Sequence, residues 1–244
     1  MTLVLDWAPS WNASCLHVAE RLSDAHSFMR EFLHAETYRS AERLRNAIHD
    51  AKGAWRDWTE LFTDDPLSSK TVQALQKHPQ LWEAWEDFRE RFEQAFPDHL
   101  DELRLRTKVL REAWEARGPG LLRKIEQLRR RPWSLEKVRI LTTYPAQSGG
   151  GVVIPQKNII RIDGVLYHLD RWLPETLRLG WLLLRLQLQR EGVCDRTPLV
   201  ALPALLNAGE QCDLLGDRET TRRLLEEHWE LRPESLGSAW EGIA

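Results

Sequence analysis

The chain has 244 residues, which is enough for one sizeable hydrophobic core or for two small cores in contact. Hydrophobic residues make up 42% and charged residues 29%, a globular balance that excludes global disorder. Lys and Arg number 34 against 37 Asp and Glu, and the net charge of -3 gives no long-range attraction for nucleic acid or an anionic membrane. Neither is an expected partner.

The cysteines indicate a reducing compartment. Cys15, Cys194 and Cys212 are odd in number, widely spaced and without a C-x-x-C pair, so neither a disulfide framework nor a zinc knuckle is expected. Residues 1–16 lack the basic lead and long apolar run of a secretory signal. The most apolar run, Leu179 to Leu184, is far shorter than the roughly 20 residues that cross a bilayer. We therefore expect a cytoplasmic protein.

Residues 1–132 are predicted to form an all-helical region. From Ser14 to Arg131, Glu, Arg, Ala and Leu dominate, and no stretch alternates with the period of two typical of strands. The expected helices share this composition and span about 14–30, 40–62, 68–78, 79–96, 98–117 and 121–130. Gly118-Pro119 is expected to separate the last two, because glycine and then proline commonly follow a helix end.

Aromatic residues are unusually frequent, with twelve tryptophans. Trp85, Phe88, Phe92 and Phe96 recur at steps of three and four residues, which places four rings on one face of the helix expected over 79–96. A face of this kind must be buried. We interpret these rings as anchors of helix packing.

Residues 133–244 are predicted to form a small sheet with helices. The β-branched and aromatic runs 138–144 and 158–162 predict strands, and 152–154 predicts a short edge strand between them. Asp163-Gly164 is the signal of a two-residue hairpin turn leading to a further strand over 165–167, because both turn positions require positive φ. Helices are then expected over 173–189, 199–215 and 217–231.

The predicted fold class is therefore α+β, mainly α. An N-terminal helical bundle, residues 1–132, is followed by a small, largely antiparallel sheet packed on helices, residues 133–244. The two regions are compatible with one cooperative unit.

A motif at the start of the helix expected over 173–189 carries a resemblance. Leu173-Pro174-Glu175-Thr176-Leu177-Arg178 opens an apolar helix directly after a strand, a glycine-rich connection, an edge strand and another strand. This order of elements, over residues 138–215, resembles the core of zinc metallopeptidases of the gluzincin type. In that family the edge strand lines the substrate cleft, the helix carries H-E-x-x-H, and a following helix supplies a third ligand.

The resemblance implies roles for individual residues. Pro174 stands where the first histidine would be, Glu175 where the general base would be, and Arg178 where the second histidine would be; Glu210 corresponds to the third ligand. Proline offers no donor atom, and a protonated arginine repels a dication, so we expect no metal and no cofactor. The same residues also fit an ordinary helix start, with Pro174 and Glu175 in the first turn and an i,i+3 pair between Glu175 and Arg178.

Other candidate constellations are weaker. The eight histidines form no i,i+4 pair and are expected to be solvated helix residues. The run Ser148 to Gly151 is followed by a strand, and it lacks the helix and the Lys-Ser/Thr pair of a phosphate loop, so it is interpreted as a flexible connection. The basic cluster around Arg129 to Arg131 is interrupted by Glu126 and is expected to be a solvated face.

The predicted function is that of a non-catalytic interaction or scaffold protein, with a metallopeptidase-like core that lacks its metal. It would bind a protein or peptide segment along the edge strand by β-addition, and it is similar in layout to bacterial proteins of no known activity. The candidate binding residues are Glu175, Arg178, Glu210, Gly149, Gly150 and Gly151. Two alternatives stay open: a hydrolase with a non-standard site using Glu175, and a nucleic-acid-associated helical protein using Arg129 to Arg131.

Overall fold

The computed structural model describes residues 3–21, 33–51, 62–63, 65–144, 151–164, 175–193 and 197–215. The helices of the first region are α1 (Trp11–Arg21), α3 (Ala35–Ala51), α4 (Ser69–Gln76), α5 (Pro79–Ala95) and α6 (His99–Arg129). The remaining elements are the strands β1 (Val4–Pro9), β2 (Lys137–Thr143), β3 (Gly151–Ile154) and β4 (Ile159–Asp163), the short 3₁₀ helix η2 (Pro155–Lys157), and the helices α7 (Glu175–Arg190) and α8 (Thr197–Gln211). The fold class, α+β and mainly α, is confirmed.

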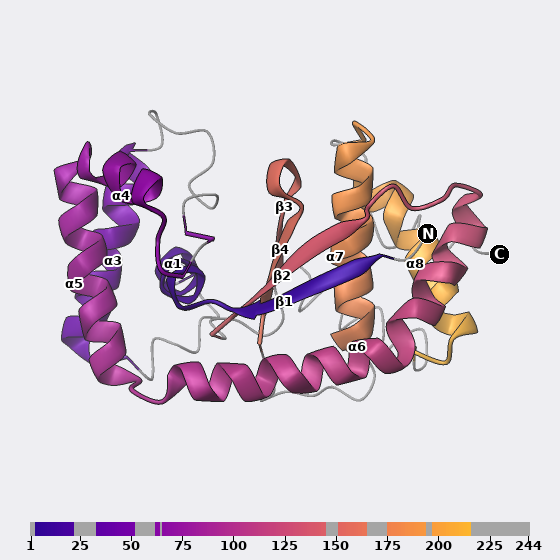
Figure 1. Ribbon diagram of the computed structural model, residues 1–244, viewed down its shortest axis with the longest axis horizontal. Coiled ribbons are helices and arrows are strands. Elements are labelled where there is room, and N and C mark those ends of the chain that lie inside the picture. Colours follow the sequence, from indigo (N-terminus) through magenta and orange to yellow (C-terminus); the bar gives the residue numbers. More distant parts are fainter. Residues whose placement is uncertain are drawn as a thin grey trace.

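The elements form three groups side by side. Helices α3, α4 and α5 lie at one end, the sheet lies in the middle, and α7 and α8 lie at the other end (Figure 1). The long helix α6 runs beneath all three groups. Among the described residues, the two larger hydrophobic cores are one around α1, α3 and α5 and one formed by the sheet with α6, α7 and α8.

The sheet is mixed, with strand order β1-β2-β4-β3. β1 pairs with β2 in parallel, β2 pairs with β4 in parallel, and only β3 is antiparallel, at the edge beside β4. The prediction of a largely antiparallel sheet is therefore wrong. It assumed that strands adjacent in the sequence pair as hairpins. In the structure, β2 pairs with β4, and β3, which lies between them in the sequence, is at the edge of the sheet.

The prediction that residues 1–132 are all helical is wrong at β1. Val4 pairs with Lys137 and Pro9 with Thr142, so the first strand of the chain joins the sheet of the second region. The signal was present but short: Leu5 and Trp7 are half-buried against the sheet core, and the alternate residues Val4 and Asp6 are exposed. The boundary at residue 132 stays a prediction.

The aromatic face of α5 is confirmed as a core element. Trp85, Phe88 and Phe92 are at most 1% exposed, and Phe96 packs against them from the helix end. Phe92 lies 5.5 Å from Phe88 and 5.0 Å from Phe96, centroid to centroid, in tilted arrangements that aromatic pairs favour. The short helix α4 also begins as expected, because the Ser68 hydroxyl accepts a hydrogen bond from the Thr71 amide.

The sheet is covered on both faces. Ile160 and Ile162 of β4 pack into the core shared with α6 and α7, while Ile159, with the alternate orientation, packs with Ala13 of α1. Asp163 has the same orientation as Ile159, because it lies four residues further along the strand. Its side chain therefore points to the α1 face.

Helix α6 is continuous where two helices were expected. It includes Pro119, and it ends only at Arg130, whose left-handed φ of 52° closes the helix. The axis changes direction in its second half (Figure 1), as is usual for a helix that contains proline. Gly118 does not end the helix; it makes room for the Trp114 ring, which a side chain at this position would overlap.

Gly118→Ala is expected to destabilise the protein. The added methyl group would improve helix propensity, but it would also force the buried Trp114 ring out of its position, and overpacking of this kind costs about 1–3 kcal/mol. Urea unfolding measures the change. Gly120→Ala is the matched control, because nothing lies within contact of a methyl group there; a Gly118→Ala variant as stable as Gly120→Ala would contradict the packing.

The hairpin turn predicted at Asp163-Gly164 is wrong. Asp163 is the last residue of β4, neither residue has positive φ, and the Gly164 amide donates to the Thr143 carbonyl, 2.9 Å away. The strand expected over 165–167 and the helix expected over 217–231 lie outside the described residues. Within the described ranges, no helix is long and apolar enough to cross a membrane.

Candidate functional site

The buried polar residues gather at one edge of the sheet. β1, β2 and β4 are parallel, so their carboxyl ends lie together, at Pro9, Thr143 and Asp163. In open sheets with parallel strands, this is the edge where ligands usually bind. We name the group of ionisable side chains at the end of β4 the strand-end cluster: His17, Arg106, Asp163, Glu175 and Arg178.

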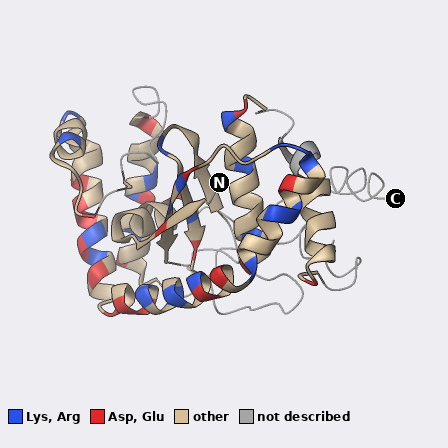
Figure 2. Ribbon diagram, turned by 45° about the vertical axis from the view of Figure 1, so that its right-hand side comes forward, with Lys and Arg blue, Asp and Glu red and all other residues tan. Residues whose placement is uncertain are grey.

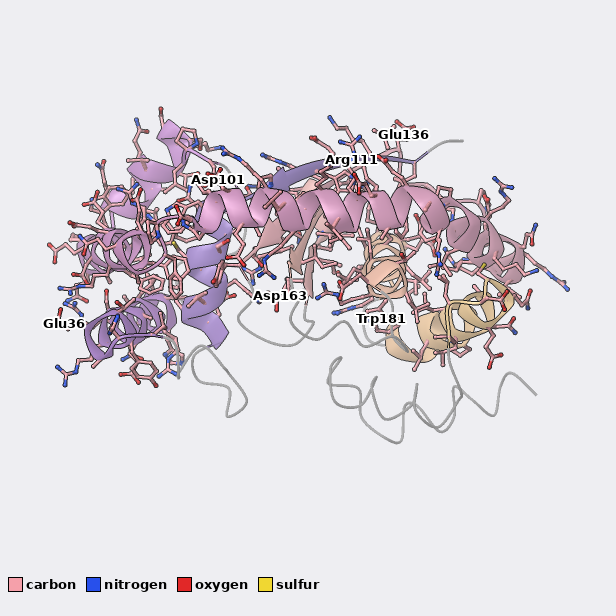
Figure 3. The ribbon with its side chains drawn as sticks, turned by 90° about the horizontal axis from the view of Figure 1, so that it is seen from below. Glu36, Asp101, Arg111, Glu136, Asp163 and Trp181 are labelled. Carbon is pink, nitrogen blue, oxygen red and sulfur yellow. The ribbon has the colours of Figure 1, made fainter. Side chains whose placement is uncertain are left out.

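Asp163 is the centre of the strand-end cluster. Its Oδ1 lies 2.7 Å from Nε2 of His17, and its backbone carbonyl accepts a hydrogen bond of 2.6 Å from the Arg178 guanidinium. The next carbonyl, that of Gly164, accepts a hydrogen bond of 3.0 Å from Arg106, which also donates to Glu102. Three helices, α1, α6 and α7, thus meet at the end of one strand. In Figure 3, Asp163 lies on the same side of α6 as α7.

Helix α1 is fixed at its start so that His17 reaches Asp163. The Ser10 hydroxyl accepts a hydrogen bond from the Ala13 amide, and the Asp65 carboxylate accepts from the amides of Trp11 and Asn12 at 2.8 and 2.9 Å. These contacts satisfy amides that have no partner within the helix. One turn later, the Ser14 hydroxyl accepts from the amide that follows β2, which locks α1 onto the sheet.

Glu175 and Arg178 form an ion pair at the start of α7. The Arg178 guanidinium donates to Oε2 of Glu175 with the same nitrogen that donates to the Asp163 carbonyl. The Arg178 side chain is 4% exposed and that of Glu175 is 22% exposed. Burial raises the pKa of Glu175 above its ordinary value, the charge and hydrogen bond of Arg178 oppose that rise, and the nearby Asp163 adds to it.

Glu175→Gln is expected to change the pH dependence of stability. A carboxyl whose pKa is raised by folding binds its proton more tightly in the folded state, so its contribution is present below the unfolded pKa and is lost as the pH rises through the folded pKa. Glutamine cannot titrate but can still accept from Arg178. The free energy of unfolding of the variant should therefore fall less than that of wild type from acidic to neutral pH. Parallel pH profiles from urea unfolding would contradict this.

The ion pair determines what the site can do chemically. A general base needs a carboxylate that faces a substrate or its water, but Glu175 is bound to a guanidinium. Among the described residues, no group of three His, Cys, Asp or Glu side chains could hold a metal ion. Glu210 is half-buried on α8, which packs on α6 and α7. Gly151 begins β3, while Pro174, Gly149 and Gly150 lie outside the described residues.

The sequence interpretation missed His17 and Asp163. The expectation of solvated histidines is wrong for His17 and His99, which are 1% and 4% exposed, whereas His34 and His49 are exposed as expected. A signal for His17 was available: it follows Ala13 by four residues and Ser14 by three, on the face of α1 that carries the small residues. Asp163 gave no such signal, because aspartate before glycine is typical of a turn.

The basic cluster near the end of α6 is partly neutralised. Arg129 makes two hydrogen bonds to the Glu191 carboxylate, at 2.7 and 2.9 Å, and its guanidinium lies 6.0 Å from the Trp133 ring centroid. Along the rest of α6, positive and negative side chains are intermixed (Figure 2). A continuous basic surface, which phosphate backbones require, is therefore not visible in this view.

Comparison with known proteins adds no relative: no protein family, no curated protein and no solved structure matches this chain. The function must be argued from the geometry of the site.

Proposed function

We propose that this protein is a non-catalytic interaction protein that binds an extended protein segment along β3, on a metallopeptidase-like core without its metal. The observation that carries the proposal is the position of β3 at the edge of the sheet. In the described residues, β3 pairs with β4 on one side only. Backbone N–H and C=O groups on the other side of such a strand can pair with an added strand.

The two edges of the sheet differ in a way that supports this choice. β1, at the opposite edge, carries Asp6 and ends at Pro9, and charges and prolines are what proteins place on edges that must not pair. β3 reads Gly-Val-Val-Ile, with no charge and no proline within it. On one face of the sheet, α7 packs against β3, and Leu182 lies against Gly151. Within the described ranges, no strand pairs with the outer side of β3, which is half-buried at Gly151 and Val152 and buried at Val153 and Ile154.

The strand-end cluster supports the non-catalytic part of the proposal. Where the resemblance would place a metal-binding histidine, the Arg178 guanidinium supplies the positive charge itself, and it binds both Glu175 and the Asp163 carbonyl. A cation fixed by the protein can position the helix and the strand, but it cannot activate water as a metal ion does. The core would therefore keep its peptide-binding edge and lack hydrolysis.

We also propose that the protein works in the bacterial cytoplasm. The cysteines support a reducing compartment: both that the structure describes, Cys15 and Cys212, are free thiols. Burial raises the pKa of the Cys15 thiol well above its ordinary value, so this side chain stays protonated and unreactive.

Peptide binding tests the proposal directly. The probe is a short synthetic peptide that alternates valine and serine, and the readout is hydrogen exchange of the β3 amides together with fluorescence anisotropy of the labelled peptide. Binding should slow exchange within Gly151–Ile154 and leave β1 unchanged. Absence of binding by this peptide and by its glutamate and lysine counterparts would overturn the proposal.

Proline variants of β3 provide the control. Backbone amides point alternately to the two sides of a strand, and proline has no amide hydrogen. Of the variants Val152→Pro and Val153→Pro, one therefore loses an amide that faces β4, and the other loses an amide that faces the outer edge. The variant that loses the outer amide should fold as wild type and lose the peptide. Unchanged affinity in that folded variant would also count against β-addition.

A further inference from the structure

Arg185 differs from the other described arginines of α7. Arg178 pairs with Glu175, and Arg190 donates to the Asn158 side chain. Arg185 is half-buried, and its guanidinium lies 5.9 Å from the centroid of the Trp181 ring, which is 4% exposed. No acidic side chain among the described residues pairs with Arg185. Burial alone lowers its pKa from the ordinary value, with no neighbouring charge contributing.

Arg185 lies on the face of α7 next to β3. Leu182 touches Gly151 at the start of β3, and Arg185 follows Leu182 by three residues, so the two share this face of the helix. Trp181, on which Arg185 stacks, lies on the same side of α6 as Asp163 (Figure 3). A strand added to the outer edge of β3 would direct every second side chain toward the sheet face that α7 covers.

We infer that Arg185 makes the site along β3 selective for acidic extended segments, in which a carboxylate on the α7 side pairs with its guanidinium. This rests on the proposed function. A half-buried cation has lost part of its hydration, and within the described ranges the contact that compensates Arg185 is the Trp181 ring. A carboxylate supplied by the bound segment completes its coordination, and the planar guanidinium can hold it with two hydrogen bonds.

The selectivity is measured with three labelled peptides that alternate valine with serine, with glutamate or with lysine. The glutamate peptide should bind at least about tenfold more tightly than the serine peptide, the effect of one charge-assisted pair. The net charge of the protein is -3, so non-specific attraction would favour the lysine peptide instead. A preference for the glutamate peptide could therefore not arise from the net charge of the protein.

Variants separate this inference from the proposed function. Arg185→Gln should abolish the preference for glutamate and leave binding of the serine peptide unchanged. Arg185→Lys keeps the charge but not the planar fork, and it should retain only part of the preference. Arg111→Gln is the charge-matched control, because Arg111 pairs with Glu115 on the other side of α6 (Figure 3) and should have no effect. Equal binding of all three peptides to wild type would overturn the role of Arg185 while leaving the edge-strand site intact. Binding of none would overturn the proposed function itself.

Discussion

Arg178→Met is expected to destabilise the protein by about 3–5 kcal/mol, the range for removal of one partner of a buried ion pair. Methionine fills similar volume but donates no hydrogen bond. The Asp163 carbonyl would lose the 2.6 Å bond from Arg178, and the Glu175 carboxylate would lose its counter-charge in a largely buried position. The free energy of unfolding in urea measures the loss.

Two further variants show whether the loss arises from the ion pair. Arg111→Met removes an exposed arginine whose side chain is 55% accessible, and it should have little effect. Glu175→Gln combined with Arg178→Met should be less destabilised than Arg178→Met alone, because no unpaired carboxylate remains. A loss in Arg178→Met no larger than in Arg111→Met would show that the strand-end cluster contributes nothing to the fold.

Trp85→Ala should produce a loss of similar size, about 3–5 kcal/mol, for a different reason. Trp85 is 1% exposed and packs against Phe62, with ring centroids 4.3 Å apart, so alanine leaves a cavity that the surrounding helices cannot fill. Trp82, on the same helix, is only half-buried, and Trp82→Ala should cost clearly less. Equal losses in urea unfolding would contradict the burial of the α5 face.

Trp85→Ala also tests whether the two cores form one cooperative unit. Trp85 belongs to the core around α3 and α5, and α7 belongs to the core under the sheet. If β1, α1 and α6 couple the cores, the variant should speed global hydrogen exchange in α5 and in α7 alike. Faster exchange confined to α3 and α5 would indicate two separately unfolding regions.

Periodicity in the sequence predicted the elements that bury a regularly spaced stripe of apolar residues. The aromatic face of α5 follows from steps of three and four residues. The apolar helix predicted to begin at residue 173 is α7, which begins two residues later, at Glu175. The order of strand, edge strand, strand and helix in the second region is also observed, as β2, β3, β4 and α7. Local signals were sufficient because these elements bury a continuous stripe.

Long-range pairing could not be read from the chain. β1 is a strand because its backbone pairs with β2, from which it is separated in the sequence by most of the first region. No local sequence pattern indicates that partner. Gly118-Pro119 resembles a helix end, but the packing of Trp114 over Gly118 keeps α6 continuous. The strand-end cluster depends on the same kind of contact, since His17 and Asp163 meet only through the folded sheet.

The zinc content of the protein after incubation with zinc and desalting tests the central claim most directly. We predict no retained zinc in wild type, because the Arg178 guanidinium donates to the Glu175 carboxylate and would repel a dication. One zinc ion retained by wild type and lost in Glu175→Gln would contradict the account.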